Sequence, residues 1–121
     1  MRTRVVAVDR GATLRGAAQA LHEASVGTAV IMDGAEVTGI LSERDVVRAL
    51  AGGADPDHAE VGAAMTVQPR YATPGDSLNT AMDTMLAAGI RHLPVLDDGE
   101  LVGIVSIRDL AEGLTAVDRR P

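Results

Sequence analysis

Residues 39–45 have the sequence Gly-Ile-Leu-Ser-Glu-Arg-Asp, and residues 103–109 have the sequence Gly-Ile-Val-Ser-Ile-Arg-Asp. The two segments are 64 positions apart, and the match continues outward without a gap, so that residues 11–50 align with residues 75–114. Repeats of this length are usually supersecondary units that bury a hydrophobic face only by packing together. We therefore expect two copies of one unit, related by pseudo-twofold symmetry, with a functional cleft at their junction.

Each copy begins with an amphipathic helix and continues with two apolar runs. Apolar residues follow Thr13 and Ser77 at positions i, i+3, i+4 and i+7, which predicts a helix that each hydroxyl caps. Acidic and glycine turns separate the apolar runs, which predicts a β-hairpin in each copy. A second helix is expected after Ser42 and after Ser106, so each copy has the order β-α-β-β-α and the fold class is α+β. The predicted strands lie at residues 5–8, 29–32 and 37–41 in the first copy and at residues 69–72, 93–96 and 101–105 in the second.

A linker separates the copies at residues 51–57, where glycine, aspartate and proline end the periodicity. We expect motifs over residues 1–56 and 57–121, with a helical turn at 61–66 leading into the second copy. Halves of about 60 residues are marginal alone, so the two should fold together.

The composition excludes several kinds of partner. Of the 121 residues 46% are apolar, Tyr71 is the one aromatic residue, and the formal net charge is −6. An acidic chain without base-stacking side chains is not expected to bind nucleic acid. The absence of cysteine fits a reducing compartment, and the apolar run at 5–8 is too short for a signal peptide or a membrane span. We expect a soluble, cytoplasmic protein with no membrane partner, and leave open whether the chain is complete or part of a larger protein.

The recurrent Gly-x-x-Ser-x-x-Asp segment has two interpretations. Ser followed three residues later by an acid is typical of a capping box, in which both side chains satisfy backbone N–H groups at a helix start. A carboxylate in the first turn of a helix can also accept both hydroxyls of a ribose, while the free N–H groups beside it suit phosphate. Gly39 and Gly103 leave room for a close approach to the returning strand, and a ligand is one candidate for it.

The duplicated β-α-β-β-α pattern, with Gly-x-x-Ser-x-x-Asp closing each copy and Ile-Arg-His-Leu-Pro-Val at residues 90–95, resembles the cystathionine β-synthase-type (CBS) domain pair, or Bateman module. The resemblance covers residues 3–115. It implies a regulatory module that binds AMP, ADP, ATP or S-adenosylmethionine in the cleft between two CBS motifs and signals to a protein partner, commonly as a homodimer. It implies no catalytic residue and no cofactor beyond this regulatory ligand.

The resemblance also implies roles for individual residues. Asp45 and Asp109 would hold the ribose hydroxyls of their sites, and Ser42 and Ser106 would contribute to sugar or phosphate binding. Four more residues match less directly: Arg44 and Arg108 are phosphate candidates, Thr66 lies near the sugar and base, and Thr3 is the weaker counterpart of Thr66.

The two copies differ in charge where their hairpins begin. The second copy has Arg91 and His92, and the first has Gly27 and Thr28. Arg91 could bind the phosphate of a nucleotide held by either aspartate, or be a solvated arginine at a strand edge. His92 fits a structural role and a ligand contact equally well.

Metal binding and catalysis are not expected. The chain lacks cysteine and a helical His-acid pattern typical of zinc sites, and Asp97 and Asp98 form a turn rather than an acid-base pair. No Ser-His-Asp set is indicated, so we expect no enzyme activity. The alternative to ligand sensing is a ligand-free dimerisation or scaffold module, in which Ser-x-x-Asp only caps helices.

Overall fold

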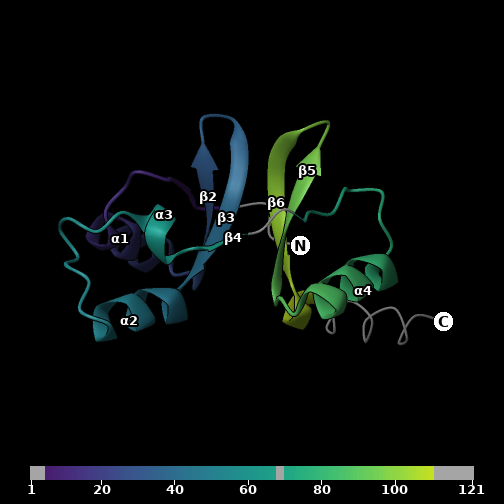
Figure 1. The fold of residues 1–121 in the computed structure, drawn as a ribbon. Coiled ribbons are helices and arrows are strands. Elements are labelled where there is room, and N and C mark those ends of the chain that lie inside the picture. Colours follow the sequence, from purple (N-terminus) through teal and green to yellow (C-terminus); the bar gives the residue numbers. More distant parts are fainter. Residues whose placement is uncertain (1–4, 68–69, 111–121) are drawn as a thin grey trace. The chain divides into compact units, whose positions relative to one another are not determined.

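The computed structural model describes residues 5–67 and 70–110, which form two compact units (Figure 1). Of the described residues, 6–67 belong to the first unit, and 5 and 70–110 belong to the second. The elements of the first unit are β1 (Ala7–Asp9), α1 (Leu14–Ala24), β2 (Thr28–Asp33), β3 (Glu36–Ser42), α2 (Glu43–Ala51), α3 (Val61–Ala64) and β4 (Thr66–Val67). Those of the second are α4 (Leu78–Ala88), β5 (His92–Asp97) and β6 (Glu100–Ser106).

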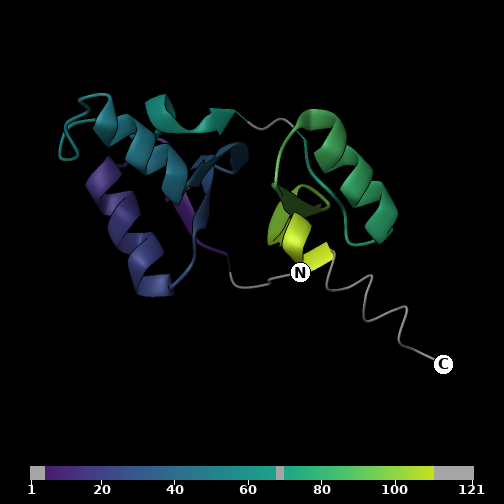
Figure 2. The same ribbon diagram turned by 90° about the horizontal axis from the view of Figure 1, so that it is seen from below.

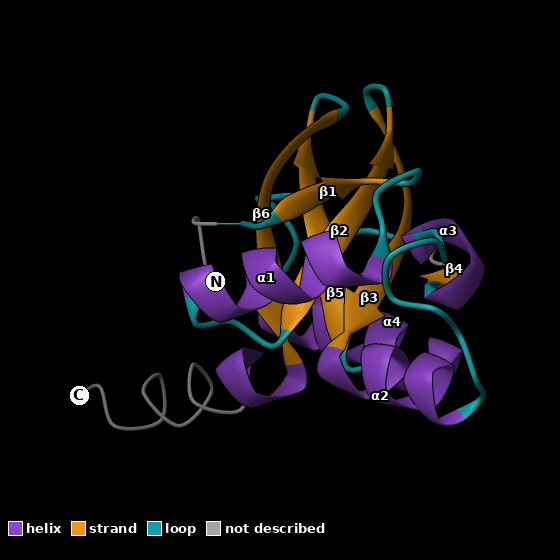
Figure 3. Ribbon diagram, turned by 90° about the vertical axis from the view of Figure 1, so that its left-hand side faces the viewer, coloured by secondary structure: helices purple, strands orange, loops and turns teal. Residues whose placement is uncertain are grey.

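The first unit is built on a four-stranded sheet with the order β1-β2-β3-β4. Strand β1 runs parallel to β2, and β2 and β3 form an antiparallel hairpin. Helices α1 and α2 lie side by side against the sheet (Figure 2). The turn of the hairpin and the start of α2 are at opposite ends of β3 (Figure 3). The predicted α+β order β-α-β-β-α is confirmed in this copy.

The short strand β4 was not expected from the sequence. It pairs antiparallel with β3, through Thr66 opposite Ile40 and Val67 opposite Gly39. The expected helical turn at residues 61–66 is present as the shorter α3, because Met65 already has extended backbone. The chain therefore leaves α3 directly into a strand that extends the sheet of the first copy.

The second unit contains the same hairpin as a two-stranded sheet, β5-β6. Of the predicted strand at 69–72, residues 70–72 are described, and one bridge is present there, in which Ala72 pairs parallel with Val95 just as Val8 pairs with Ile31 in the first copy. Both hairpins also have a register shift at the same place, between Ile31 and the next residue and between Val95 and the next residue. After β6 the chain is helical over residues 107–110, and the remainder of the expected last helix lies outside the described residues.

The first helix of each copy has the cap that the sequence predicted. The Thr13 hydroxyl accepts a hydrogen bond from the Gly16 N–H at 3.1 Å, and the Ser77 hydroxyl accepts one from the Thr80 N–H at 3.1 Å. Both helices end in a residue of left-handed conformation, which lets its N–H satisfy carbonyls of the last turn. These caps set the length of the helix at 11 residues in both copies.

Each unit has an apolar core between its sheet and its helices. Aliphatic residues fill both cores, as the shortage of aromatic residues requires. The buried core residues of the first unit are Val8, Leu14, Ala17, Leu21, Ala29, Ile31, Leu41, Val46 and Val61. Those of the second are Ala72, Ala81, Met85, Leu93, Val95, Val105 and Leu110.

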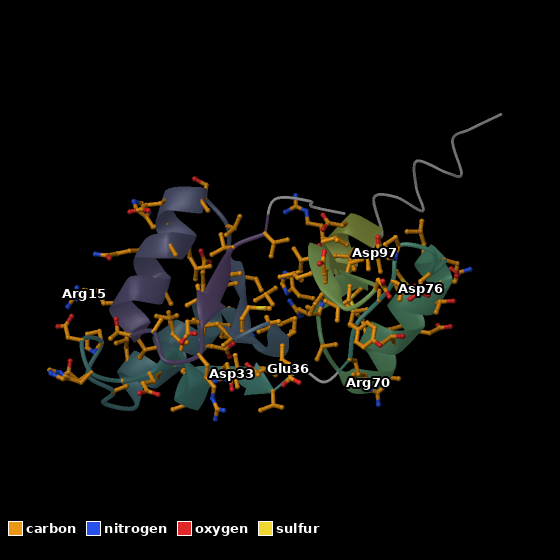
Figure 4. All side chains as sticks on the ribbon, turned by 90° about the horizontal axis from the view of Figure 1, so that it is seen from above. Arg15, Asp33, Glu36, Arg70, Asp76 and Asp97 are labelled. Carbon is orange, nitrogen blue, oxygen red and sulfur yellow. The ribbon has the colours of Figure 1, made fainter. Side chains whose placement is uncertain are left out.

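The segment between the copies packs on the start of α1. The Leu14 N–H donates to the Ala59 carbonyl at 3.0 Å, and the Arg15 guanidinium donates to the Asp57 carboxylate on the outer side of the helix (Figure 4). The hydrogen bond from Arg15 lowers the pKa of Asp57 below its usual value. The pKa of Asp55 is also lowered, first by the Asp57 N–H and then by the side chain of His58. These contacts join the segment to the first unit.

None of the helices in the described part of the chain is both long enough and apolar enough to span a membrane.

Candidate ligand-binding site

In the first copy, β3 ends at Ser42 and α2 begins at the next residue. Ser42 has extended backbone, and its hydroxyl accepts a hydrogen bond from the Asp45 N–H at 3.1 Å. The Oδ2 atom of Asp45 accepts one from the Ser42 N–H at 2.9 Å. The two side chains thus form a capping box that satisfies two backbone donors. Asp45 is 6% exposed, so its carboxylate is held in one orientation at the start of the helix.

The second copy repeats this geometry at the end of β6. The Ser106 hydroxyl accepts a hydrogen bond from the Asp109 N–H at 2.9 Å, and Oδ2 of Asp109 accepts one from the Ser106 N–H at 3.1 Å. Asp109 is half-buried rather than buried. The capping interpretation is therefore confirmed in both copies, and ribose binding by the two aspartates stays a prediction.

The second carboxylate oxygen distinguishes the two aspartates. Arg48 donates from Nη1 to Oδ1 of Asp45 at 3.3 Å, one turn further along α2. The residue at the corresponding position of the second copy is Glu112, which lies outside the described residues. A carboxylate oxygen can accept more than one hydrogen bond, so Asp45 keeps the capacity to accept a hydroxyl beside Arg48. Arg48 orients this carboxylate, and an acidic residue at that position cannot do the same for Asp109.

The start of each hairpin lies next to the start of the following helix. Thr28 pairs with Ser42 in the first copy, and His92 pairs with Ser106 in the second. The residues next to these pairs are also hydrogen-bonded. The Glu43 N–H donates to the Gly27 carbonyl at 2.9 Å, and the Ile107 N–H donates to the Arg91 carbonyl at 2.9 Å. Arg91 and His92 therefore lie beside Ser106, in the same unit as Asp109. Whether either contacts a ligand stays a prediction.

Gly39 makes room for the chain itself. A Cβ atom at this position would lie 2.6 Å from Sδ of Met65 and 2.7 Å from the carbonyl oxygen of Thr66. Both contacts are far closer than real Cβ atoms allow, so the glycine permits β4 to pair with β3. This gives Gly39 a structural role that the sequence analysis did not identify. A ligand contact at Gly39 or at Gly103, which lies opposite Val95 in the second hairpin, remains a prediction.

Two of the remaining candidate residues belong to the capping boxes, and the other two lie elsewhere in the chain. Arg44 and Arg108 are exposed and directly precede the two aspartates. Thr66 is exposed in β4, at the edge of the first sheet. Thr3 lies outside the described residues. The structure thus brings Ser42, Arg44 and Asp45 together in one unit, and brings Arg91, His92, Ser106, Arg108 and Asp109 together in the other.

Two charged residues near these boxes were missed by the sequence analysis. Glu43 directly follows the capping serine of the first copy, and Arg48 pairs with Asp45. Their counterparts in the second copy are Ile107 and Glu112. The signal was available in the internal alignment, since both positions change charge between the copies, and the neighbours of position 43, Ser42 and Arg44, are identical to Ser106 and Arg108. The part of the chain that the structure describes contains no group of three His, Asp or Glu residues that could hold a metal ion.

Comparison with known proteins assigns the family. The CBS domain model matches residues 1–52 and 60–116, so the chain belongs to the CBS-domain family and contains two CBS motifs in tandem. Pairs of CBS motifs are regulatory modules. Among curated proteins, a 17.7 kDa protein of Acidianus ambivalens is 40% identical over 117 residues, which are 95% of this chain and 70% of the relative.

Solved structures show the same fold. A putative signal-transduction protein with CBS domains from Burkholderia ambifaria is 31% identical, with a TM-score of 0.85 over 98% of this chain and 88% of that chain. The CBS domain protein PAE2072 from Pyrobaculum aerophilum, solved in complex with AMP, is 30% identical, with a TM-score of 0.80 over 96% of this chain and 99% of that chain.

Proposed function

We propose that this protein is a ligand-sensing regulatory module that binds adenosyl compounds and passes its occupancy state to a protein partner. The observation that carries the proposal is the AMP complex of the Pyrobaculum aerophilum protein, which matches this chain over nearly the full length of both. The ligand class comprises AMP, ADP, ATP and S-adenosylmethionine, which share the adenosine group. Homodimerisation and a cytoplasmic location belong to the same proposal.

The chemistry of the capping boxes supports this ligand class. A ribose offers two neighbouring hydroxyl donors, and Asp45 and Asp109 each present a carboxylate whose orientation the capping serine fixes. Hydrogen bonds to a charged acceptor contribute about 1.5–3 kcal/mol, more than those between neutral groups. The serine, the aspartate and the preceding arginine recur in both copies, so each copy has the residues for one ligand.

A ligand-free scaffold is the second candidate function. The observation that favours it is that Ser42 and Asp45 already satisfy each other's backbone, as do Ser106 and Asp109. A capping box alone explains why these residue types occur at this spacing. In this hypothesis the module would only dimerise or hold another protein.

Thermal unfolding separates the two functions. Protein freed of co-purified nucleotide, whose adenine absorption would be conspicuous in a chain with one tyrosine and no tryptophan, is melted with and without millimolar AMP, ADP, ATP or S-adenosylmethionine. A ligand that binds only the folded state adds about 2.7 kcal/mol at a hundredfold excess over Kd, and Tm should rise by several degrees. Flat melts with all four ligands would favour the scaffold.

Asparagine variants test the site itself. Asparagine is a good cap and a poorer acceptor for ribose hydroxyls because it lacks the charge. Asp45→Asn and Asp109→Asn should each keep most of the stability and weaken ligand binding at the corresponding site by about tenfold. Calorimetric titration that gives wild-type affinity for both variants would show that the aspartates are only caps.

A further inference from the structure

We propose that Met65 is an oxidation site, at which hydrogen peroxide or another hydroperoxide converts the thioether to a sulfoxide and thereby releases strand β4 from β3. This role does not depend on which ligand the module binds. It gives the regulatory module a second input, the oxidation state of one side chain in the first unit.

Met65 lies at the point where α3 ends and β4 begins. Its N–H donates to the Val61 carbonyl at 2.9 Å, its backbone is extended, and the next two residues form β4. Strand β4 lies beside β3 and pairs with it only at Gly39 and Ile40 (Figure 1). Because a strand of two residues makes few backbone hydrogen bonds, its pairing depends on how closely Met65 fits against β3.

The sulfur atom of Met65 lies in close contact with β3. A Cβ atom at Gly39 would be 2.6 Å from Sδ, so the sulfur lies against the backbone of this glycine. The Thr38 hydroxyl oxygen is 3.9 Å from the same sulfur. Met65 is half-buried and packs against the apolar core of the first unit. An oxygen atom added to Sδ therefore has no room between the sulfur and Gly39.

A sulfoxide at this position opposes the pairing of β4 in two ways. Oxidation makes the side chain polar, and its burial against the apolar core becomes unfavourable. The Thr38 hydroxyl donates to the Ile31 carbonyl at 3.3 Å, beside the register shift between β2 and β3. A thioether sulfur is only a weak acceptor, whereas a sulfoxide oxygen competes with Ile31 for this hydroxyl. Oxidation thus disturbs β3 as well as β4.

The reaction needs only the peroxide and the thioether. A lone pair of Sδ attacks one peroxide oxygen, an S–O bond forms, and the O–O bond breaks. The proton on the transferred oxygen passes to the departing hydroxide, which leaves as water. The sulfur loses two electrons and the peroxide gains them. Methionine sulfoxide reductases reverse the oxidation, so the site can return to its original state.

The other methionines do not offer the same response. The chain has five methionines, of which Met1 lies outside the described residues and Met85 is 0% exposed. Met32 and Met82 are half-buried, but they lie in the six-residue strand β2 and the 11-residue helix α4, which have many backbone hydrogen bonds. Met82 packs against the core of the second unit and provides a matched control for Met65.

Peroxide treatment of the whole chain tests the proposal, with Met65→Leu and Met82→Leu as variants that keep the approximate volume and lose the sulfur. Peptide mass spectrometry locates the sulfoxides, at a peroxide exposure that leaves Met85 unmodified. Oxidation should lower Tm of the wild type and of Met82→Leu by at least about 3 °C, and that of Met65→Leu by less than half as much. Hydrogen exchange in the peptides that contain residues 39–40 and 66–67 should become faster in the wild type and stay unchanged in Met65→Leu.

A second variant keeps the test decisive if leucine does not fit against Gly39. Met65→Ala also lacks the sulfur, and each variant is compared with its own untreated sample, so a lower starting Tm does not affect the result. Treatment of the oxidised wild type with methionine sulfoxide reductase should restore both Tm and slow exchange. The proposal is overturned by equal losses of Tm in the wild type and both Met65 variants, by Met65 sulfoxide with unchanged exchange in β4, or by oxidation of Met82 without oxidation of Met65.

Discussion

The two copies keep one backbone and change the side chains around it. Thr28 opposite Ser42 and His92 opposite Ser106 are equivalent pairs, and the register shift of each hairpin falls at the same step. The glycine, serine and aspartate that fix the strand end and the helix start are identical in both copies. Residues 27, 43 and 48 carry different charges from their counterparts 91, 107 and 112. The local fold thus depends on few residues, and the chemistry beside it is free to diverge.

The cores of the two copies also differ, because equivalent buried positions have side chains of different size. Ala29 in the first copy corresponds to Leu93 in the second, and both are fully buried. Two other core positions have the smaller residue in the second copy: Val95 is equivalent to Ile31, and Val105 is equivalent to Leu41. Cores tolerate such exchanges when the total volume and the apolar pattern are kept. Each core is therefore complementary within its own copy, and single exchanges between copies should be costly.

The largest effect is expected from breaking this complementarity. Leu93→Ala should lower the free energy of unfolding by about 2–5 kcal/mol, because the residue is 0% exposed and its removal leaves a cavity. The reverse exchange, Ala29→Leu, should cost about 1–3 kcal/mol by overpacking. Urea unfolding at fixed pH measures both. A loss below about 1 kcal/mol in Leu93→Ala would mean that the second core repacks around the smaller residue.

The next effect concerns β4, the strand found on the first copy. Gly39→Ala should destabilise the protein by about 1–3 kcal/mol, because the new methyl group meets Sδ of Met65 and the carbonyl of Thr66. Met65→Ala should restore only part of this loss, since the carbonyl belongs to the backbone. Gly75→Ala is the control, with no atom within 4 Å of its new Cβ. Similar unfolding curves for Gly39→Ala and Gly75→Ala would contradict the close approach of β4.

The strand β4 also shows where prediction from sequence stops. The duplicated apolar periodicity and the hydroxyl caps were enough to predict the α+β order, both hairpins and the first helices. Those features depend on residues close together in the sequence, and each occurs in both copies. Pairing of β4 with β3 depends on a two-residue segment without periodicity, and a close approach of a ligand would explain Gly39 equally well. A close approach of two backbones is a tertiary property that one glycine does not specify.

In the candidate site too, the local contacts could be predicted from the sequence and the contacts between distant residues could not. The capping boxes were predictable, because Ser-x-x-Asp satisfies backbone groups within four residues. The proximity of Arg91 to Ser106 required the hairpin register, which the apolar runs predict only approximately. The contact of Arg48 with Asp45 follows from helical spacing, but the sequence analysis considered the motif alone.

A smaller effect distinguishes the two aspartates. Asp45→Ala and Asp109→Ala should each cost about 1 kcal/mol for the lost cap, and Asp45→Ala should cost more. The reason is that Asp45 is nearly buried and also accepts a hydrogen bond from Arg48. A double-mutant cycle with Arg48→Ala should give a coupling of about 0.3–0.5 kcal/mol that decreases with salt, because the arginine is exposed. Equal costs and no coupling would show the two copies to be equivalent at this position.

The smallest effect concerns the segment between the copies that packs on α1, where Arg15 contacts Asp57. The second copy has Asn79 at the position of Arg15 and so lacks this arginine. Arg15 lowers the pKa of Asp57 through a hydrogen bond, and the Asp57 N–H and His58 lower that of Asp55. A carboxylate whose folded pKa lies below its unfolded value stabilises the fold above the unfolded pKa, and this contribution is lost as pH falls through the folded pKa. Arg15→Gln should therefore lower Tm slightly at neutral pH, and the difference should disappear as the pH falls below about 4. Melts of the two proteins across this range provide the measurement, with Arg44→Gln as a control that leaves the segment intact. If the difference persists unchanged in acid, the Arg15 side chain stabilises the segment through contacts other than its ion pair with Asp57.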